Sequence, residues 1–397
     1  MRVLYVVQRY GREVAGGAEL ACRQFATHLG EWGHDVEVVT TCATSYVDWA
    51  DLYDPGTSDL DGVTVHRLSV PQPRQDRVFG PLNTRAVWSD TPVALHLQRE
   101  WMRIQGPNVP DLAPWLAEHV SDYDVIVFFT YLYNTTWAGL KVAAPRAVTV
   151  LHPTAHDEPP LYLPIFDQMF RLPSAFAFFT EEEASLVTRR FGITPLHDVI
   201  GIGIDLDLPA NPDAFRAAFG VHDPYLVFVG RLDPGKGSDE LFDFFVTYKR
   251  RNPGPLKLVL VGDPVRPVPP HPDVVPTGFV DVEMRRAAVA GATALVQPSY
   301  FESFSMVLTE AWALSRPALV QSHCDVLRGQ ARRSGGGLPY RGFAQFEAAV
   351  DLLLADPRLG RDLGAAGRSY VETRYSWSAV MDRYQELLLY VRWRSLL

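Results

Sequence analysis

Cysteine is scarce in this chain of 397 residues, which contains only Cys22, Cys42 and Cys324. Three cysteines cannot all pair, and none has C-x-x-C spacing, so the sequence supports neither a disulfide framework nor a zinc knuckle. Long hydrophobic runs are missing too, because no stretch reaches the roughly 18 apolar residues that span a membrane. The apolar residues 3–7 are too few for a signal peptide and are expected to form a buried strand. These absences predict a soluble protein of the reducing cytoplasm.

An excess of basic residues is also lacking. The chain has 37 Lys and Arg against 46 Asp and Glu, which gives a formal net charge of -9 at pH 7. Sequence-independent nucleic-acid binding needs a basic surface that releases counterions, so we expect no nucleic-acid partner. Apolar residues, by contrast, make up 47% of the chain. A chain of this length and composition can bury two cores, and two domains are expected.

Short apolar runs alternate with amphipathic segments along the whole chain. This spacing predicts an α/β fold in which each half forms a parallel sheet wound with helices. The glycine- and proline-rich residues 195–212 separate the halves, so the domains are predicted at 1–200 and 201–377. The clearest helices are 18–32, 343–355 and 378–397. The predicted strands are 3–7, 36–40, 63–68, 125–129, 147–151 and 175–179 in the first half, and 226–229, 257–261, 274–277, 294–297 and 318–321 in the second.

Residues 71–114 form an insertion that is rich in proline, arginine and aromatic residues. Thr91 as a cap and Pro92 at the first helical position predict the start of a helix there. This helix brings Trp101 close to arginines, so it could line an acceptor groove or touch an anionic membrane surface. Packing of the helix on its own domain is the simpler interpretation.

Residues 295–317 contain the main candidate site. They predict a short buried strand, a polar turn and a helix that stops at a proline. Ser303 is placed to cap this helix, so the N–H groups of residues 304–306 would bind an anion such as a phosphate. Glu302 and Glu310 flank the turn and could accept hydrogen bonds from sugar or ribose hydroxyls. Taken alone, the two glutamates would more simply be a helix-dipole partner and a solvated helix residue.

A glycine-rich loop with two cations precedes this stretch. The apolar strand at 225–229 ends in Gly230 and Arg231, and Lys236 and Gly237 follow a few residues later. The two cations could neutralise a diphosphate. The loop also satisfies G-x4-G-K, which makes a P-loop NTPase the chief alternative. A P-loop needs Ser or Thr directly after its lysine to hold Mg²⁺, and here that position is Gly237.

Together these stretches resemble a known family. Glu302-Ser303-Phe304 followed by Glu310 resembles the E-x7-E motif of family 4 retaining glycosyltransferases, the glycosyl transferases group 1. Gly230-Arg231 with Lys236-Gly237 resembles their diphosphate loop, and residues 16–19, 260–263, 278–281 and 375–377 extend the similarity. The resemblance implies the GT-B fold, two doubly wound Rossmann-like domains facing a central cleft. The first domain would bind the acceptor and the second the nucleotide-sugar, with the last helix packed back on the first.

The implied reaction is transfer of a sugar from an NDP-sugar to a hydroxyl of a sugar, lipid-linked sugar or small molecule, with retention. Neither a cofactor nor a metal is expected, because Arg231, Lys236 and the helix end can stabilise the leaving diphosphate. The D-x-D pairs at 59–61, 122–124 and 205–207 are no more frequent than chance predicts. An epimerase or hydrolase of the same fold stays open as an alternative, beside the P-loop NTPase.

The resemblance also assigns residues. Glu310 would bind the ribose, Glu302 the sugar, and Phe279 with Val280 the base. His152 follows a strand at the sheet edge where open α/β folds bind ligands, and would contact the donor sugar; His156 and Asp157 are weaker candidates. The expected catalytic residues are His152, Arg231, Lys236 and Glu302, and the expected donor-binding residues are Gly16, Gly17, Gly230, Phe279, Val280, Ser303, Phe304, Ser305, Met306, Val307 and Glu310.

One of these positions departs from the family. Where Ser305 stands the family commonly has glycine, so the backbone could approach the donor differently and alter the choice of sugar.

Overall fold

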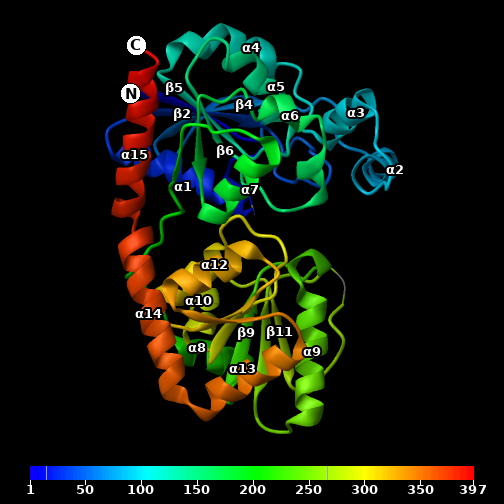
Figure 1. Ribbon diagram of the computed structural model, residues 1–397, viewed down its shortest axis with the longest axis vertical. Coiled ribbons are helices and arrows are strands. Elements are labelled where there is room, and N and C mark those ends of the chain that lie inside the picture. Colours follow the sequence, from blue (N-terminus) through cyan, green and yellow to red (C-terminus); the bar gives the residue numbers. More distant parts are fainter. Residues whose placement is uncertain (15, 266) are drawn as a thin grey trace. The chain divides into compact units, whose positions relative to one another are not determined.

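The computed structural model describes residues 1–14, 16–265 and 267–397 (Figure 1). The chain divides into two compact units. Unit 1 comprises Met1–Ile200 and Met381–Leu397, and unit 2 comprises Gly201–Val380. Each unit is a sheet with helices packed against it, so the α/β class expected from the sequence is confirmed.

Unit 1 contains an eight-stranded sheet in the order β3-β4-β2-β1-β5-β6-β7-β8. All neighbouring strands are parallel except β3, which pairs antiparallel with β4 at the edge. The central strands are buried along almost their whole length, as expected where helices cover both faces of a parallel sheet. The strands are β1 (Arg2–Val6), β2 (Asp35–Thr41), β3 (Gly56–Leu60), β4 (Val63–Leu68), β5 (Val125–Phe129), β6 (Thr149–His152), β7 (Ala175–Phe178) and β8 (His197–Val199).

The chain's last helix contributes to the core of unit 1. Its residues from Met381 onward belong to this unit, and the buried Tyr5 hydroxyl donates to the Tyr384 hydroxyl at 3.0 Å. The helices are α1 (Gly17–Glu31), α2 (Asp76–Val87), α3 (Leu95–Gln105), α4 (Leu112–His119), α5 (Asn134–Ala143), α6 (Phe166–Met169), α7 (Glu181–Phe191) and α15 (Trp377–Arg394), with 3₁₀ turns at Val120–Asp122 and Pro159–Tyr162.

The insertion differs from its prediction. Helix α3 begins at Leu95 with Ala94 as its N-cap, so the start predicted at Thr91 and Pro92 is wrong. Trp101 is buried, and its indole N–H donates to Asn83 Oδ1 at 2.9 Å, which ties α3 to α2. The insertion thus packs on its own unit, and no contact with a membrane is shown. None of the helices in the described parts of the chain is long and apolar enough to cross a bilayer.

Unit 2 contains a six-stranded parallel sheet in the order β11-β10-β9-β12-β13-β14. After β9 the chain builds β10 and β11 on one side, and it then returns to place β12 on the other side of β9. This reversal is the position at which open α/β sheets bind ligands, beyond the carboxyl ends of the strands. The strands are β9 (Tyr225–Val229), β10 (Lys257–Val261), β11 (Val274–Gly278), β12 (Ala294–Gln297), β13 (Ala318–Gln321) and β14 (Gly337–Tyr340).

Helices connect these strands and follow the last of them. A 3₁₀ turn at Pro234–Lys236 precedes α9 in the loop after β9. The helices are α8 (Pro212–Phe219), α9 (Ser238–Arg251), α10 (Val282–Ala290), α11 (Met306–Ala313), α12 (Asp325–Ser334), α13 (Phe343–Ala355) and α14 (Pro357–Tyr375).

Candidate functional site

Two glycines let the loops after β9 and β10 approach each other closely. Gly230 and Gly262 have φ values of 146° and 136°, a region that residues with a Cβ rarely adopt. A Cβ on Gly262 would lie 2.1 Å from the Gly230 carbonyl oxygen, so a side chain cannot fit there. The Gly230 N–H donates to the Val261 carbonyl at 2.9 Å and keeps the loop against the neighbouring strand. The glycine predicted at 230 therefore shapes the loop that carries the cations.

Both predicted cations lie on this loop. Arg231 donates from Nε to the Asp233 carboxylate, and its side chain stays half exposed. Lys236 Nζ donates to Glu302 Oε1 at 2.8 Å, which joins the loop after β9 to the loop after β12. Burial acts to lower the pKa of Lys236, but the charges of Glu302 and Asp233 outweigh it and the pKa is raised. Lys236 is therefore a positive charge held at the reversal of the sheet.

The start of α11 differs from the prediction. Ser303 does not cap the helix, because α11 begins only at Met306 and its N-cap is Ser305. Ser305 has φ 74° and ψ 81°, a left-handed conformation that delays the first helical turn by two residues. Its hydroxyl accepts a hydrogen bond from Gln297 Nε2 at 2.8 Å instead of capping the helix. The helical N–H groups at this end belong to Met306 and the residues after it.

Phe304 lies inside unit 2 rather than at a ligand surface. Its side chain is buried, and its ring meets the Tyr375 ring edge-on at 5.0 Å between centroids. The Phe304 carbonyl accepts a hydrogen bond from Gln330 Nε2. Any contact of Phe304 with a donor would therefore involve its main chain, while Met306 and Val307 on the first turn of α11 are half-buried.

The two predicted glutamates have different partners. Glu302 Oε1 accepts from Lys236 and, at 3.3 Å, from Gln297 Nε2. Glu310 Oε1 accepts from Arg285 Nη2 on α10 at 3.0 Å. Burial raises the pKa of Glu310, although the charge of Arg285 opposes this shift. Glu310 is thus paired and partly buried rather than a solvated helix residue.

The predicted base contact lies after β11. The Phe279 side chain is 78% exposed, although it is one of the largest apolar side chains of the unit. Its main-chain N–H donates to Asp263 Oδ1 at 3.2 Å, which fixes the loop after β11 to the loop after β10. Val280 beside it is half-buried. An exposed ring on an anchored loop can stack on a flat aromatic base.

In unit 1, Gly16 and Gly17 are exposed where α1 begins. A Cβ on Gly16 would lie 2.2 Å from Glu19 Oε2, so a side chain there would displace the glutamate carboxylate. Glu19 is buried and accepts hydrogen bonds at Oε1 from Gln8 Nε2 at 2.8 Å and Arg9 Nε at 2.9 Å. This buried ion pair has no local sequence signal, because Arg9 lies in the loop after β1 and Glu19 lies in α1.

His152 ends β6, but its side chain faces the interior. The ring has no exposed surface and lies among Phe25, Phe129, Phe179 and Tyr384, with centroids 4.3 to 5.4 Å away. Nε2 lies 3.3 Å from the Tyr384 hydroxyl, and burial lowers the pKa of His152 to about 3. The side chain has no exposed surface and is packed among aromatic rings, so the structure lends no support to the predicted sugar contact, which stays a prediction.

Glu183 is a buried carboxylate that was not among the predicted site residues. Its Oε1 accepts from the Ala155 N–H and its Oε2 from the Phe179 N–H, both at 2.7 Å. It thereby fixes the loop after β6, which carries the partly exposed His156. The pattern Thr180-x-x-Glu183 is a capping-box signature that could have found it, since the Thr180 hydroxyl accepts from the Glu183 N–H at 3.2 Å.

Part of unit 2 is similar to a known protein family. The family model described as Glycosyl transferases group 1 matches residues 223–356, which lie in unit 2. A D-inositol 3-phosphate glycosyltransferase from Frankia alni is 30% identical over 392 residues, covering 83% of this chain and 94% of the relative. The chain belongs to the glycosyl transferases group 1. Another such enzyme, from Rhodococcus erythropolis, is 30% identical over 51% of this chain and 50% of its own length.

Solved structures show that this glycosyltransferase has the GT-B fold. Sucrose-phosphate synthase from Thermosynechococcus elongatus superposes with a TM-score of 0.73 at 20% identity, over 100% of this chain and 98% of that one. HepE from Anabaena, in complex with UDP-glucose, gives 0.68 at 15% identity over 98% and 99% of the two chains. The family and the fold predicted from the E-x7-E motif and the glycine-rich loop are therefore confirmed.

No metal centre is evident in the part of the chain that the structure describes. Within residues 1–14, 16–265 and 267–397, histidine, cysteine and carboxylate side chains do not gather in threes that could hold a metal ion. The three cysteines are buried and free. Metal independence of this glycosyltransferase stays a prediction.

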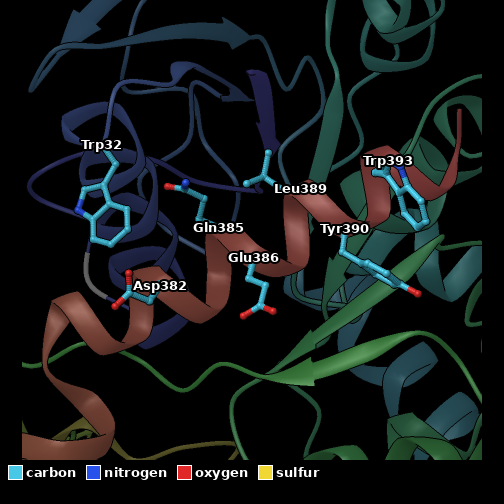
Figure 2. Close-up of a pocket in the computed structure, with 7 residues that line it drawn as sticks. All are labelled: Trp32, Asp382, Gln385, Glu386, Leu389, Tyr390 and Trp393. Carbon is cyan, nitrogen blue, oxygen red and sulfur yellow. The ribbon is translucent and has the colours of Figure 1, made fainter.

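A surface cavity of about 410 Å³ lies on unit 1, and none of the residues that line it is a predicted site residue (Figure 2). Trp32 at the end of α1 borders it, and the remaining lining comes from one side of α15. Along α15 its polar side chains come first, and the apolar Leu389, Tyr390 and Trp393 follow. The lining residues are Trp32, Asp382, Gln385, Glu386, Leu389, Tyr390 and Trp393.

Proposed function

We propose that this glycosyltransferase moves a sugar from an NDP-sugar to a hydroxyl acceptor, with retention of the anomeric configuration and without a divalent metal. The proposal depends mainly on one observation. Lys236 and Glu302 meet at 2.8 Å where the strand order of unit 2 reverses, and both residues lie within the segment that the family model matches. Lys236, a cation that can bind phosphate, thus lies beside Glu302, a carboxylate that can accept hydrogen bonds from sugar hydroxyls.

The donor would extend over the carboxyl ends of β9 to β12. Phe279 would stack on the base, Glu310 would accept from the ribose hydroxyls, and Arg231 with Lys236 would hold the diphosphate. Glu302 would then meet the sugar, which must follow the diphosphate in any NDP-sugar. The N–H groups at the start of α11 add donors for phosphate or sugar oxygens. Gly16 and Gly17 remain predicted contacts of the same donor.

Negative charge develops on the leaving diphosphate during transfer. Fixed cations placed where this charge appears stabilise the transition state without reorganising, and removal of one such group from an active site typically costs about 2.7–4 kcal/mol. Lys236 meets this requirement because its pKa is raised and its position is fixed by Glu302. Two cations and a helix N-terminus can therefore take the place that Mg²⁺ has in other phosphate-transferring sites.

Retention would proceed by transfer on the front face of the sugar, assisted by the leaving phosphate. The two buried glutamates of unit 1 are unsuited to act as covalent nucleophiles: Glu19 is paired with Arg9, and Glu183 accepts main-chain N–H groups. The acceptor would be a hydroxyl of a sugar, polyol or lipid-linked sugar, in cytoplasmic synthesis of a glycan, glycolipid or glycosylated metabolite. The relative named for D-inositol 3-phosphate supports an acceptor of this class.

The proposal is tested with the purified full chain. Release of nucleoside diphosphate is measured from UDP-, ADP- and GDP-sugars, with and without sugar and polyol acceptors, and the anomeric configuration of the product is read from its NMR coupling constants. We expect acceptor-dependent release and a product that keeps the donor's configuration. Complete donor consumption without acceptor would instead indicate a hydrolase or epimerase, and an inverted product would contradict the mechanism. No observation favours a P-loop NTPase.

A further inference from the structure

Gln297 links the two ends of the turn that precedes α11. It is the last residue of β12, and its side chain is buried. Its amide nitrogen donates to Ser305 Oγ at 2.8 Å and to Glu302 Oε1 at 3.3 Å. An amide nitrogen carries two hydrogens, so both are used within this turn.

The two carboxylate oxygens of Glu302 differ in their hydrogen-bond partners. Oε1 accepts from both Lys236 and Gln297. Among the described residues, none donates to Oε2, although the side chain is only 10% exposed. A carboxylate oxygen without a protein donor can accept a hydrogen bond from a hydroxyl of a bound molecule. The carboxylate therefore has one oxygen held by the protein and one available to a ligand.

Ser305 is held in an unusual conformation at the other end of this turn. Its φ of 74° is favourable for glycine but strained for a residue with a Cβ. Such strain persists only where surrounding contacts enforce it, and it is frequent at ligand sites. Glycine would relieve the strain but would leave the Gln297 amide without this acceptor. The serine hydroxyl is thus the feature that distinguishes this turn from one containing glycine.

We propose that Ser305 is a specificity-determining positioning residue. By accepting a hydrogen bond from Gln297, it keeps the amide against Oε1 of Glu302, so that Oε2 faces the donor. The enzyme then selects donor sugars that carry a hydroxyl where Oε2 points, over analogues deoxygenated at that position. This inference rests on the proposed function in that Glu302 must meet the transferred sugar.

The test uses four variants of the full chain: Ser305→Ala, Ser305→Gly, Gln297→Met and the double variant Ser305→Ala with Gln297→Met. The matched control is Ser315→Gly, because Ser315 has φ 54° just beyond the other end of α11 and is exposed. First, the wild type is assayed with UDP-glucose, ADP-glucose and GDP-mannose. Then kcat and KM are measured for the donor it uses and for the monodeoxy analogues of that sugar.

We expect one deoxy analogue to be a much poorer donor than the parent for the wild type. Ser305→Ala and Ser305→Gly should both reduce this preference about two- to twelvefold, the range expected for a net hydrogen bond of roughly 0.5–1.5 kcal/mol. In the Gln297→Met background, Ser305→Ala should have little further effect, because it acts through the amide. Ser315→Gly should keep the wild-type preference.

Other outcomes would overturn the inference. If Ser305 only shapes the backbone, Ser305→Gly will keep the full preference, since glycine adopts the same φ more easily. Equal losses from Ser305→Ala with and without Gln297 would show that the serine does not act through the amide. If the wild type uses none of the three NDP-sugars, the proposed function is wrong, and the role of Ser305 that rests on it is wrong too. If the wild type is active but both Ser305 variants keep the preference for the parent sugar over the deoxy analogue, the role proposed for Ser305 is wrong and the proposed function stands.

Discussion

Replacement of His152 by phenylalanine separates a packing role from a catalytic one. The histidine ring is buried among four aromatic rings, and within the described residues its Nδ1 has no hydrogen-bond partner. A phenylalanine ring has a similar shape and loses only the contact with the Tyr384 hydroxyl, which still bonds to Tyr5. The folded chain should therefore accept the change, and the variant removes the one side chain of this cluster whose ordinary pKa of 6.5 lies near neutral pH.

The expected effect on stability follows from the two pKa values. Burial lowers the pKa of His152 to about 3 from an ordinary value of 6.5. Between these values the unfolded state binds more protons than the folded state, so stability is lost as the pH falls from 6.5 towards 3. At pH 5 the loss is about 2 kcal/mol relative to pH 7. His152→Phe should lack this part of the acid destabilisation.

Urea denaturation at pH 7 and pH 5 measures the difference. The control is His96→Phe, because His96 lies exposed on α3 and should leave the wild-type dependence unchanged. Transferase activity of His152→Phe at pH 7 should stay within a few-fold of the wild type. If His152→Phe loses as much stability between pH 7 and pH 5 as the wild type does, the His152 ring is not buried in its neutral form. Loss of activity in a stable His152→Phe variant would instead restore the catalytic role predicted from the sequence.

Three further predictions concern the donor site. Arg231→Ala and Lys236→Ala should each reduce kcat on the order of a hundredfold, since each removes a cation from the leaving diphosphate; wild-type kcat in either would refute its role. Excess EDTA should leave initial rates unchanged if the two cations and the helix end replace Mg²⁺, whereas inactivation reversed by Mg²⁺ would contradict this. Phe279→Ala should raise the donor KM about tenfold with no loss of thermal stability, because the ring is exposed and a base stack is worth roughly 1–3 kcal/mol; an unchanged KM would exclude stacking.

Most buried strands could be predicted from apolar runs alone, because strands covered on both faces are continuously apolar. Strand β3 was missed for the opposite reason: residues 56–60 are mostly exposed and polar, and their pairing at the sheet edge leaves no periodic signal. Strand β14, whose sequence is Gly-Leu-Pro-Tyr, contains two residues that normally argue against a strand. Local sequence therefore predicts the centre of each sheet better than its edges.

The candidate site shows the same limit. The motif residues Lys236 and Glu302 were predicted and do meet in the structure. The helix cap was misplaced because Ser303 has the right residue type, while the left-handed conformation of Ser305 depends on its surroundings. Partners such as Gln297 and Arg285 lie on other elements, and only the folded chain brings them to the glutamates.

The donor-binding role that we propose for Glu310 depends on the charge of its carboxylate. Arg285 holds Oε1, and Oε2 accepts no hydrogen bond from the described residues, so it is available to the ribose. Glu310→Gln keeps an acceptor but loses the charge, which should cost roughly 1.5–3 kcal/mol of donor interaction. Glu347→Gln is the matched control, because Glu347 pairs with Arg251 at 2.7 Å at the end of α9, away from the carboxyl ends of the strands.

The decisive measurement is kcat/KM for a ribo donor and its 2′-deoxyribo form, in the wild type, Glu310→Gln and Glu347→Gln. The wild type and the control should use the deoxyribo donor much less well than the ribo donor, and Glu310→Gln should discriminate far less between them. If Glu310→Gln keeps the full discrimination between the two donors, Glu310 does not bind the ribose, and the nucleotide-sugar site has been placed on the wrong residues.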